Sequence, residues 1–225
     1  MCGRFGLFTP PEDLSERFGA DLTFDYEPRY NIAPRDDVAT IRNVDEEHIV
    51  EQEWGLLPHW AEDTDEEPRP INARSETVAE KPMFEEAFKE RRCLVLTDGF
   101  YEWKGERGNK QPFRVHLADD DPFAMAGIWN RFEANGEALE TVTILTTEPN
   151  EVIEPIHDRM PVVLERDDED TWLAGAPDQA LAACGPYEGS DMAAYEVSTA
   201  LNNPENDGAE VILPADTEQS GIEEF

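Results

Sequence analysis

The chain has 225 residues, of which 39% are hydrophobic, and this supports one ordinary hydrophobic core rather than two self-sufficient domains. The formal net charge of −34 resembles that of salt-adapted cytoplasmic proteins, in which molar salt screens the repulsion between surface carboxylates. No run approaches the roughly 18 apolar residues of a membrane span, and the start of the chain lacks the regions of a signal peptide, so we expect a soluble, cytoplasmic protein.

The first predicted element is a helix over residues 10–18. Thr9 is a capping residue, prolines follow at the first helical positions, and Glu12 lies three residues after the cap. Leu14 and Phe18, four residues apart, would form the buried stripe of this helix. Strands are predicted over 38–44 and 49–54 with a polar turn between them, and an acidic, proline-bearing loop is predicted over 62–70.

The rest of the chain is predicted to be rich in strands. Two short helices over 75–80 and 82–89 precede strands over 93–97, 100–104, 113–117, 123–129, 141–146 and 161–164. Further helices are expected over 167–173 and 178–184. This order predicts a single α+β domain over 1–207, dominated by antiparallel strands that form a barrel-like sheet with short peripheral helices. An acidic C-terminal tail would follow over 208–225.

The cysteines and histidines do not have the spacing of a metal site. Cys2, Cys93 and Cys184 are scattered and include no C-x-x-C pair, which argues against a disulfide framework and against structural zinc. The four histidines show neither H-x-x-x-H nor H-E-x-x-H spacing. We therefore expect neither a metal nor a cofactor.

Cys2 is a candidate nucleophile because methionine aminopeptidase normally removes Met1 before a small residue. Removal would expose a 1,2-aminothiol, whose α-amine has an ordinary pKa of about 7.7 to 8.0 and is partly neutral near pH 7. The thiol could then close onto an imine carbon, in an intramolecular step with an effective molarity of about 10⁵ M or more. Such a pair is suited to trapping an aldehyde as a thiazolidine. The alternative from position alone is a buried or incidental cysteine.

Six short segments carry a family resemblance. They are Cys-Gly-Arg-Phe at 2–5, Arg-Tyr-Asn-Ile-Ala-Pro at 29–34, Trp-Gly-Leu at 54–56, Asn-Ala-Arg-Ser-Glu-Thr at 72–77, Asp-Gly-Phe-Tyr-Glu-Trp at 98–103 and His-Asp-Arg-Met-Pro-Val at 157–162. In this order they resemble the SOS-response-associated peptidase (SRAP) family, the abasic-site processing proteins. The resemblance extends over about residues 1–207.

The resemblance implies four catalytic residues. Cys2 would be the covalent nucleophile, and Asn72 would orient the N-terminal residue and the adduct. Glu102 would be the carboxylate that manages protons on the Cys2 amine or on the opening sugar. His157 would be the acid–base group for ring opening and imine formation. These roles also agree with the chemistry itself, because imine formation needs one group to accept a proton and another to donate one.

The resemblance also implies a DNA-binding surface. Phosphates would be contacted by Arg4, Arg74 and Arg159, and bases would stack on Trp54, Trp60 and Trp103. Trp103 is expected to be the best placed of these rings because it follows Glu102 in the sequence. The expected partner is single-stranded DNA that contains an abasic site, including sites at a junction with duplex. A monomer is the expected state.

Other functions are compatible with parts of the sequence. Cys2 with His157 could act as the nucleophile and base of a peptidase or of a self-processing enzyme. Met-Cys-Gly also opens glutamine amidotransferases, but these resemble the chain only at its first residues. A noncovalent single-stranded DNA-binding module would leave Cys2 without a chemical role. The sequence as a whole favours covalent capture of abasic sites through Cys2, which would shield the lesion in the DNA damage response.

Overall fold

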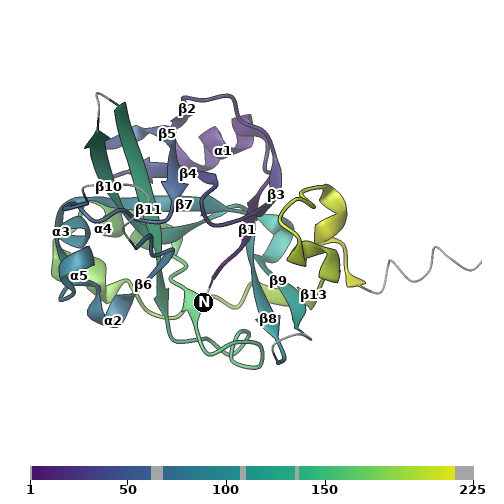
Figure 1. Ribbon diagram of the computed structural model, residues 1–225. Helices are drawn as coiled ribbons and strands as arrows, with labels where there is room; N and C mark the ends of the chain where they lie inside the picture. The colour runs from purple at the N-terminus through teal and green to yellow at the C-terminus, as the bar shows by residue number, and fades with distance from the viewer. Residues whose placement is uncertain (1, 62–67, 107–109, 135–136, 216–225) are drawn as a thin grey trace, which may run out of the picture.

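The computed structural model describes residues 2–61, 68–106, 110–134 and 137–215, and these form two β-sheets with short helices around them (Figure 1). Most of the acidic loop predicted over 62–70 and the last part of the predicted tail, 216–225, lie outside the described residues. None of the helices in the described part is long and apolar enough to cross a bilayer.

Part of the larger sheet closes into a barrel. The barrel consists of five strands, which are neighbours in the order β11 (Glu137–Thr147), β10 (Phe123–Ala134), β7 (Arg92–Thr97), β4 (Asp37–Arg42) and β5 (Asp45–Trp54). These neighbours are antiparallel, and a parallel pairing of β5 with β11, at Glu53–Thr141 and Trp54–Val142, completes the ring. Closure pairs the edges that an open sheet would expose. The predicted barrel-like sheet of an α+β fold is confirmed.

Three short strands extend this sheet, and two of them flank β11. β2 (Asp21–Leu22) pairs with β5, whereas β6 (Asn72–Arg74) and β12 (Met160–Pro161) both pair with β11. Thr146 of β11 is opposite Arg74 on one side and Pro161 on the other. The two sequence segments at 72–77 and 157–162 are therefore brought to the same strand, although they are far apart in the chain.

The second sheet is fully antiparallel, and β1 (Phe5–Leu7), near the start of the chain, lies inside it between two partner strands. The strand order of this sheet is β13 (Met192–Glu196), β9 (Gln111–Leu117), β8 (Gly99–Lys104), β1 and β3 (Arg29–Ile32). Glycine is required where β8 begins, since Gly99 has a φ of 156° and an added Cβ would lie 2.7 Å from the Val115 carbonyl oxygen. The backbone conformation of Gly99 therefore allows β8 to begin beside β1 and β9.

All five predicted α-helices are confirmed. They are α1 (Pro11–Phe18), α2 (Ser75–Val78), α3 (Pro82–Glu90), α4 (Arg166–Ala174) and α5 (Pro177–Ala182), and α2 to α5 gather on one side of the barrel (Figure 1). Leu14 of α1 is fully buried, as its spacing predicts, and Phe84 and Phe88 of α3 pack into the same core. Three short 3-10 helices complete the described chain: Ala118–Asp120, Thr199–Asn202 and Ala209–Ile212.

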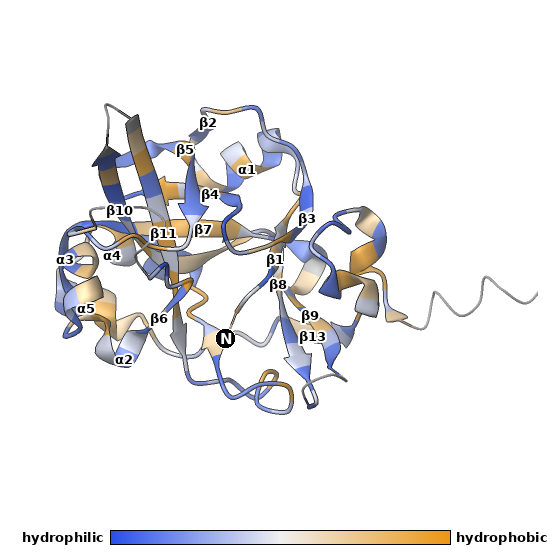
Figure 2. Ribbon diagram, viewed as in Figure 1, coloured by the Kyte–Doolittle hydropathy of each residue, from blue (hydrophilic) through white to orange (hydrophobic). Residues whose placement is uncertain are grey.

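The buried hydrophobic residues form one large core and one small cluster. Figure 2 shows the hydropathy of each residue along the ribbon. The small cluster contains Tyr101, Val197, Leu201 and Val211, so the C-terminal segment through residue 215 packs against the second sheet. The strand predicted over 161–164 is shorter than expected. After β12, the Val162 amide still donates to the Leu145 carbonyl of β11, and Val163 forms a bridge with Met125 of β10.

Candidate functional site

Cys2 is fully buried, just before β1, at the place where Figure 1 marks the N-terminus between β6 and β8. β1 runs antiparallel to β8 with Phe5 opposite Phe100, and the Tyr101 amide donates a hydrogen bond to the Arg4 carbonyl at 2.9 Å. The same register, continued toward the N-terminus, puts Gly3 opposite Glu102, and the charge of Glu102 acts on the thiol of the neighbouring Cys2. Backbone pairing therefore positions the cysteine.

The side chains of β8 alternate between two environments, as expected for a strand. Phe100 faces the large core that also contains Cys2, whereas Tyr101 and Trp103 face the small cluster on the other side of the sheet. Glu102 has the parity of Phe100 and so points to the Cys2 side. Trp103 follows Glu102 in the sequence but points to the opposite face of the sheet, because adjacent residues in a strand alternate in direction. The Trp103 indole instead donates to Asn202 Oδ1 at 2.7 Å.

Asn72 holds the main chain of Cys2. Its Nδ2 donates a hydrogen bond of 2.7 Å to the Cys2 carbonyl, which joins the start of β6 to the start of the chain. The other amide atom, Oδ1, is buried and has no hydrogen-bond partner among the described residues. An unsatisfied buried acceptor is costly, so this oxygen is available to a donor that enters the site.

Glu102 is a nearly dry carboxyl group, with 2% of its surface exposed. Burial raises its pKa from the ordinary value of 4.5 to about 7. Both protonation states are consequently populated near neutral pH, as a group that accepts and returns a proton requires. Glu102 Oε2 lies 3.9 Å from His157 Nε2.

His157 belongs to the turn that precedes β12 and is held through one ring nitrogen. Its Nδ1 lies 3.0 Å from the Arg159 amide and 3.1 Å from Asp158 Oδ1. These contacts direct the opposite nitrogen, Nε2, toward Glu102. Burial is the main cause that lowers the pKa of His157 below its ordinary value, so the ring is largely neutral at pH 7.

The thiol of Cys2 is not activated as a thiolate. Burial, together with the charge of Glu102, raises its pKa far above the ordinary value. Its Sγ lies 3.7 Å from the Arg4 carbonyl oxygen, within hydrogen-bonding range for sulfur. Near neutral pH the group is therefore a neutral S–H rather than the anion that nucleophilic cysteines use.

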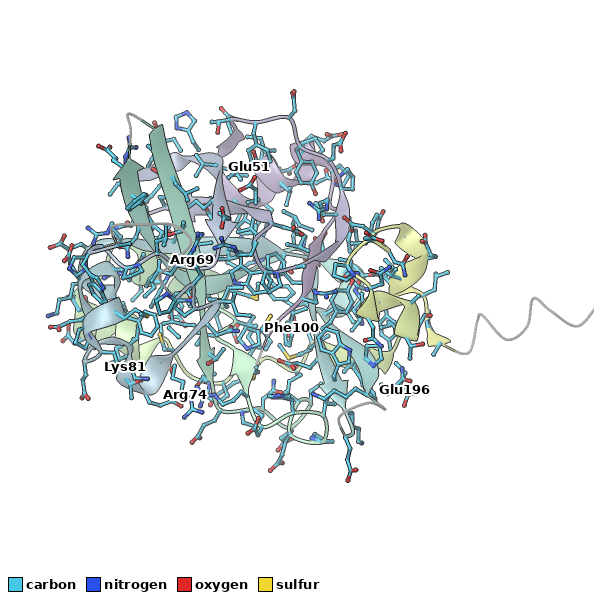
Figure 3. All side chains as sticks on the ribbon, viewed as in Figure 1. Glu51, Arg69, Arg74, Lys81, Phe100 and Glu196 are labelled. Carbon is cyan, nitrogen blue, oxygen red and sulfur yellow. The ribbon has the colours of Figure 1, made fainter. Side chains whose placement is uncertain are left out.

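The three arginines expected on phosphates lie in different surroundings. Arg4 Nη1 donates to Asn31 Oδ1 at 2.9 Å and to the Leu201 carbonyl at 3.1 Å, so this side chain supports the fold. Arg159 forms an ion pair with Glu76. Arg74 is exposed at the end of β6 (Figure 3), and no carboxylate in the described part of the chain lies within ion-pair distance of it.

The three tryptophans also differ in exposure. Trp54 is fully buried. Its ring packs edge-on against that of Phe5, with the ring centroids 5.1 Å apart, and its Nε1 donates a hydrogen bond to the Ile71 carbonyl at 2.9 Å. Its ring cannot stack on a base in this structure, which corrects the expectation that it contacts DNA. Trp60 is 43% exposed and Trp103 is half-buried, so these two rings remain accessible.

Two polar residues with no predicted role hold the C-terminal segment beside the site. Asp207 Oδ1 accepts the backbone N–H groups of Tyr30 and Asn31, each at 2.6 Å. The Asn31 amide donates to the carbonyls of Leu201, Asn203 and Asn206. Asn31 lies within the segment 29–34, but the sequence gives no indication of which distant carbonyl groups its side chain will contact.

Known proteins are similar to this chain over nearly its whole length. The family described as SOS response associated peptidase (SRAP) matches residues 1–204. The abasic site processing protein YoqW of Bacillus subtilis is 41% identical over 221 residues, which cover 94% of this chain and 99% of that protein. The abasic site processing protein YedK of Escherichia coli is 35% identical, over 95% of this chain and 100% of that protein.

The fold is shared with a solved structure as well. A crystal structure of a protein from Bacteroides thetaiotaomicron superposes with a TM-score of 0.86 at 26% identity, and the alignment covers 95% of this chain and 100% of that chain. The family match spans both sheets and every segment that carries the candidate site. The chain therefore belongs to the SOS response associated peptidase (SRAP) family.

Proposed function

We propose that the protein captures abasic sites in single-stranded DNA by forming a thiazolidine with Cys2, once Met1 has been removed. The observation that carries this proposal is the meeting of three chain segments at Cys2. Asn72 bonds the Cys2 carbonyl, and β8 brings Glu102 alongside, 3.9 Å from His157. Relatives named abasic site processing proteins support the class of substrate.

The reaction balances without an oxidant or a reductant. The neutral α-amine of Cys2 attacks C1′ of the ring-opened deoxyribose, and loss of water from the carbinolamine gives an imine. The Cys2 thiol then adds to the imine carbon, and its proton passes to the nitrogen. One amine, one thiol and one aldehyde thus give one thiazolidine and one water, with the second step favoured by its intramolecular geometry.

Glu102 and His157 supply the proton transfers. A carboxyl group with a pKa of about 7 can take a proton from the Cys2 ammonium group and return it to the departing hydroxyl. The neutral His157 ring, with Nε2 directed toward Glu102, can exchange a proton with the sugar oxygen as the ring opens. The buried Oδ1 of Asn72 can accept a hydrogen bond from the adduct.

The state of the thiol favours capture over peptidase chemistry. A cysteine peptidase attacks through a thiolate, which here would be disfavoured by burial and by the charge of Glu102. In aldehyde capture the amine attacks first and the thiol follows onto an activated imine carbon, so no stable thiolate is needed.

Arg74 and Trp60 are the proposed first contacts with DNA outside the reacting centre. Arg74 ends the strand that Asn72 begins, and its exposed guanidinium group can bind a phosphate close to the captured sugar. Trp60 is exposed and can stack on a base, including one at a junction with duplex. We propose that the protein acts as a monomer.

The test uses purified protein whose loss of Met1 has been verified by mass spectrometry. It is incubated in high KCl with a single-stranded oligonucleotide that contains one natural abasic site, and in parallel with one that contains a tetrahydrofuran, which has no aldehyde. We expect a shift on a denaturing gel for the natural site alone, and none for Cys2→Ala. No shift from Met1-free protein would refute covalent capture.

A further inference from the structure

An ion pair joins the two segments that carry Asn72 and His157. Arg159 Nη1 lies 2.5 Å from Glu76 Oε1, and Arg159 Nη2 lies 2.9 Å from Glu76 Oε2. Glu76 is in α2, directly after the strand that Asn72 begins, and Arg159 is two residues after His157. Two parallel hydrogen bonds between a guanidinium group and a carboxylate fix orientation as well as distance.

The same arginine is also anchored on the strand between these segments. Arg159 Nη2 donates to the Thr146 carbonyl at 2.7 Å and lies 3.3 Å from the Thr146 hydroxyl. Thr146 is the residue of β11 that pairs with Arg74 on one side and Pro161 on the other. Glu76, Arg159 and Thr146, here called the brace, therefore join α2, β11 and the residue before β12.

The brace continues to the imidazole through the main chain. The Arg159 amide donates to His157 Nδ1 at 3.0 Å, so the residue that binds Glu76 with its side chain orients the histidine with its backbone. At the other end, β6 presents the Asn72 amide to the Cys2 carbonyl at 2.7 Å. A shift of Arg159 would move His157 relative to Asn72.

The Arg159 end of the ion pair is largely buried, and the Glu76 end is exposed. The Arg159 side chain is 13% exposed, although that of Glu76 is 45% exposed. Hydrogen bonds from Arg159 are the main cause that lowers the pKa of Glu76, so the carboxylate is ionised throughout the neutral range. Both terminal nitrogens of Arg159 donate hydrogen bonds to Glu76. Arg74, at the end of β6, is exposed and is therefore the more accessible of the two arginines to a phosphate.

We propose that Glu76 is a positioning residue, which acts through Arg159 and Thr146 to fix His157 relative to Asn72. The effect on reaction rate rests on the proposed function, whereas the brace itself is a property of the free protein. Glu76 also places a negative charge close to the phosphate-binding Arg74, so its presence opposes DNA binding while it supports the chemistry.

Loss of the Glu76 charge should therefore strengthen DNA binding and slow crosslinking at the same time. A residue with only a structural role would not change these two quantities in opposite directions. In Glu76→Gln we expect noncovalent binding to the tetrahydrofuran oligonucleotide to tighten roughly twofold, because a carboxylate near the phosphates is lost. Crosslinking to the natural abasic site at saturating DNA should slow by about tenfold, since the acid–base group is no longer held in position. Arg159→Lys, which keeps the charge but not the paired hydrogen bonds, should also slow crosslinking.

Glu80→Gln is the matched control, because Glu80 is exposed two residues beyond α2 and loses the same charge. It should leave the crosslinking rate unchanged. A Glu76→Gln protein that binds more tightly but crosslinks at the wild-type rate would overturn the proposal and leave Glu76 as an unfavourable surface acid. Weaker binding together with a lower melting temperature would overturn it in favour of a role in folding alone.

A second measurement on the DNA-free protein separates this proposal from the proposed function. The His157 ring protons are titrated by NMR in the wild type and in Glu76→Gln. The charges that act on this ring are those of Glu102, Asp158, Lys110 and the start of the chain, and the substitution leaves all of them in place. We expect the pKa of His157 to rise toward its ordinary value as the released ring becomes hydrated.

An unchanged His157 titration would refute the brace even if wild-type protein crosslinks normally. Conversely, wild-type protein that never crosslinks would refute the proposed function, while the titration would still decide whether Glu76 positions His157.

Discussion

Glu102 shows how one buried residue connects stability with reactivity. Because burial raises its pKa to about 7, the folded state binds a proton more tightly than the unfolded state between about pH 4.5 and pH 7. The free energy of unfolding should therefore fall as pH rises through this window, by up to about 3 kcal/mol. The ionised Glu102 carboxylate, which the proposed chemistry uses near neutral pH, thus destabilises the fold at that pH.

Glu102→Gln removes this dependence and gives a direct test. The variant should gain stability relative to the wild type when both are moved from pH 5 to pH 8, and its crosslinking should be slower at both values. Urea unfolding at the two pH values measures the first effect and denaturing gels measure the second. Parallel pH dependences of stability for the two proteins would contradict the raised pKa.

The sequence predicted which residue types the site needs, but not how side chains would be exposed. The resemblance placed Cys2, Asn72, Glu102 and His157 in one site, and their catalytic roles remain predictions. Trp54 and Trp103 show the limit of the sequence. Whether an indole faces a core or solvent depends on strand pairing with distant residues, and in this fold Trp54 closes the barrel while Trp103 turns away from Glu102.

Among the secondary-structure elements, long strands were predictable and short ones were not. β10 contains an apolar run and β11 a β-branched run that identify them as strands, and α1, α3 and α5 each have a proline in the first turn. β1, β3 and β6 have three or four residues each, too few for a period of two to be distinguished from chance. They are strands only because β8, β1 and β11 offer them backbone partners.

Trp54 lies where β5 pairs with β11, whereas Trp103 lies on β8, and substitutions of the two residues should have different effects on stability. Trp54→Ala should lower the free energy of unfolding by about 3 to 5 kcal/mol, because it leaves a cavity where the barrel closes. Trp103→Ala, at a half-buried ring, should cost clearly less. Chemical unfolding of both variants measures this difference. Equal losses would mean that Trp103 is as important to packing as Trp54, against their difference in exposure.

For the whole molecule, charge is the dominant property. With a formal net charge of −34, repulsion between carboxylates opposes the compact state, and molar salt reduces the screening length to about 3 Å. The melting temperature should therefore rise between 0.1 M and 2 M KCl. Chloride is chosen over sulfate so that screening is separated from preferential exclusion of the salt. A melting temperature that stays level or falls would contradict this expectation.

The proposed arginine contact to phosphate predicts how DNA binding responds to salt. Noncovalent affinity for the tetrahydrofuran oligonucleotide should fall as KCl increases, because counterion release contributes less to binding. A thiazolidine linkage, once formed, should persist across the whole range. Filter binding and denaturing gels on the same samples would measure the two quantities, and a crosslinked fraction that dissociates with salt would argue against a covalent bond.

The interior position of β1, between β8 and β3 in the second sheet, has a consequence for biosynthesis. Residues 5–7 leave the ribosome early, but one of their two partner strands, β8, ends only at Lys104. Until that strand emerges, the N-terminus has no complete docking site and stays accessible to an aminopeptidase. Folding then buries Cys2. Under the proposed chemistry, maturation of the nucleophile is therefore timed by translation, with an interval that ends when β8 pairs with β1.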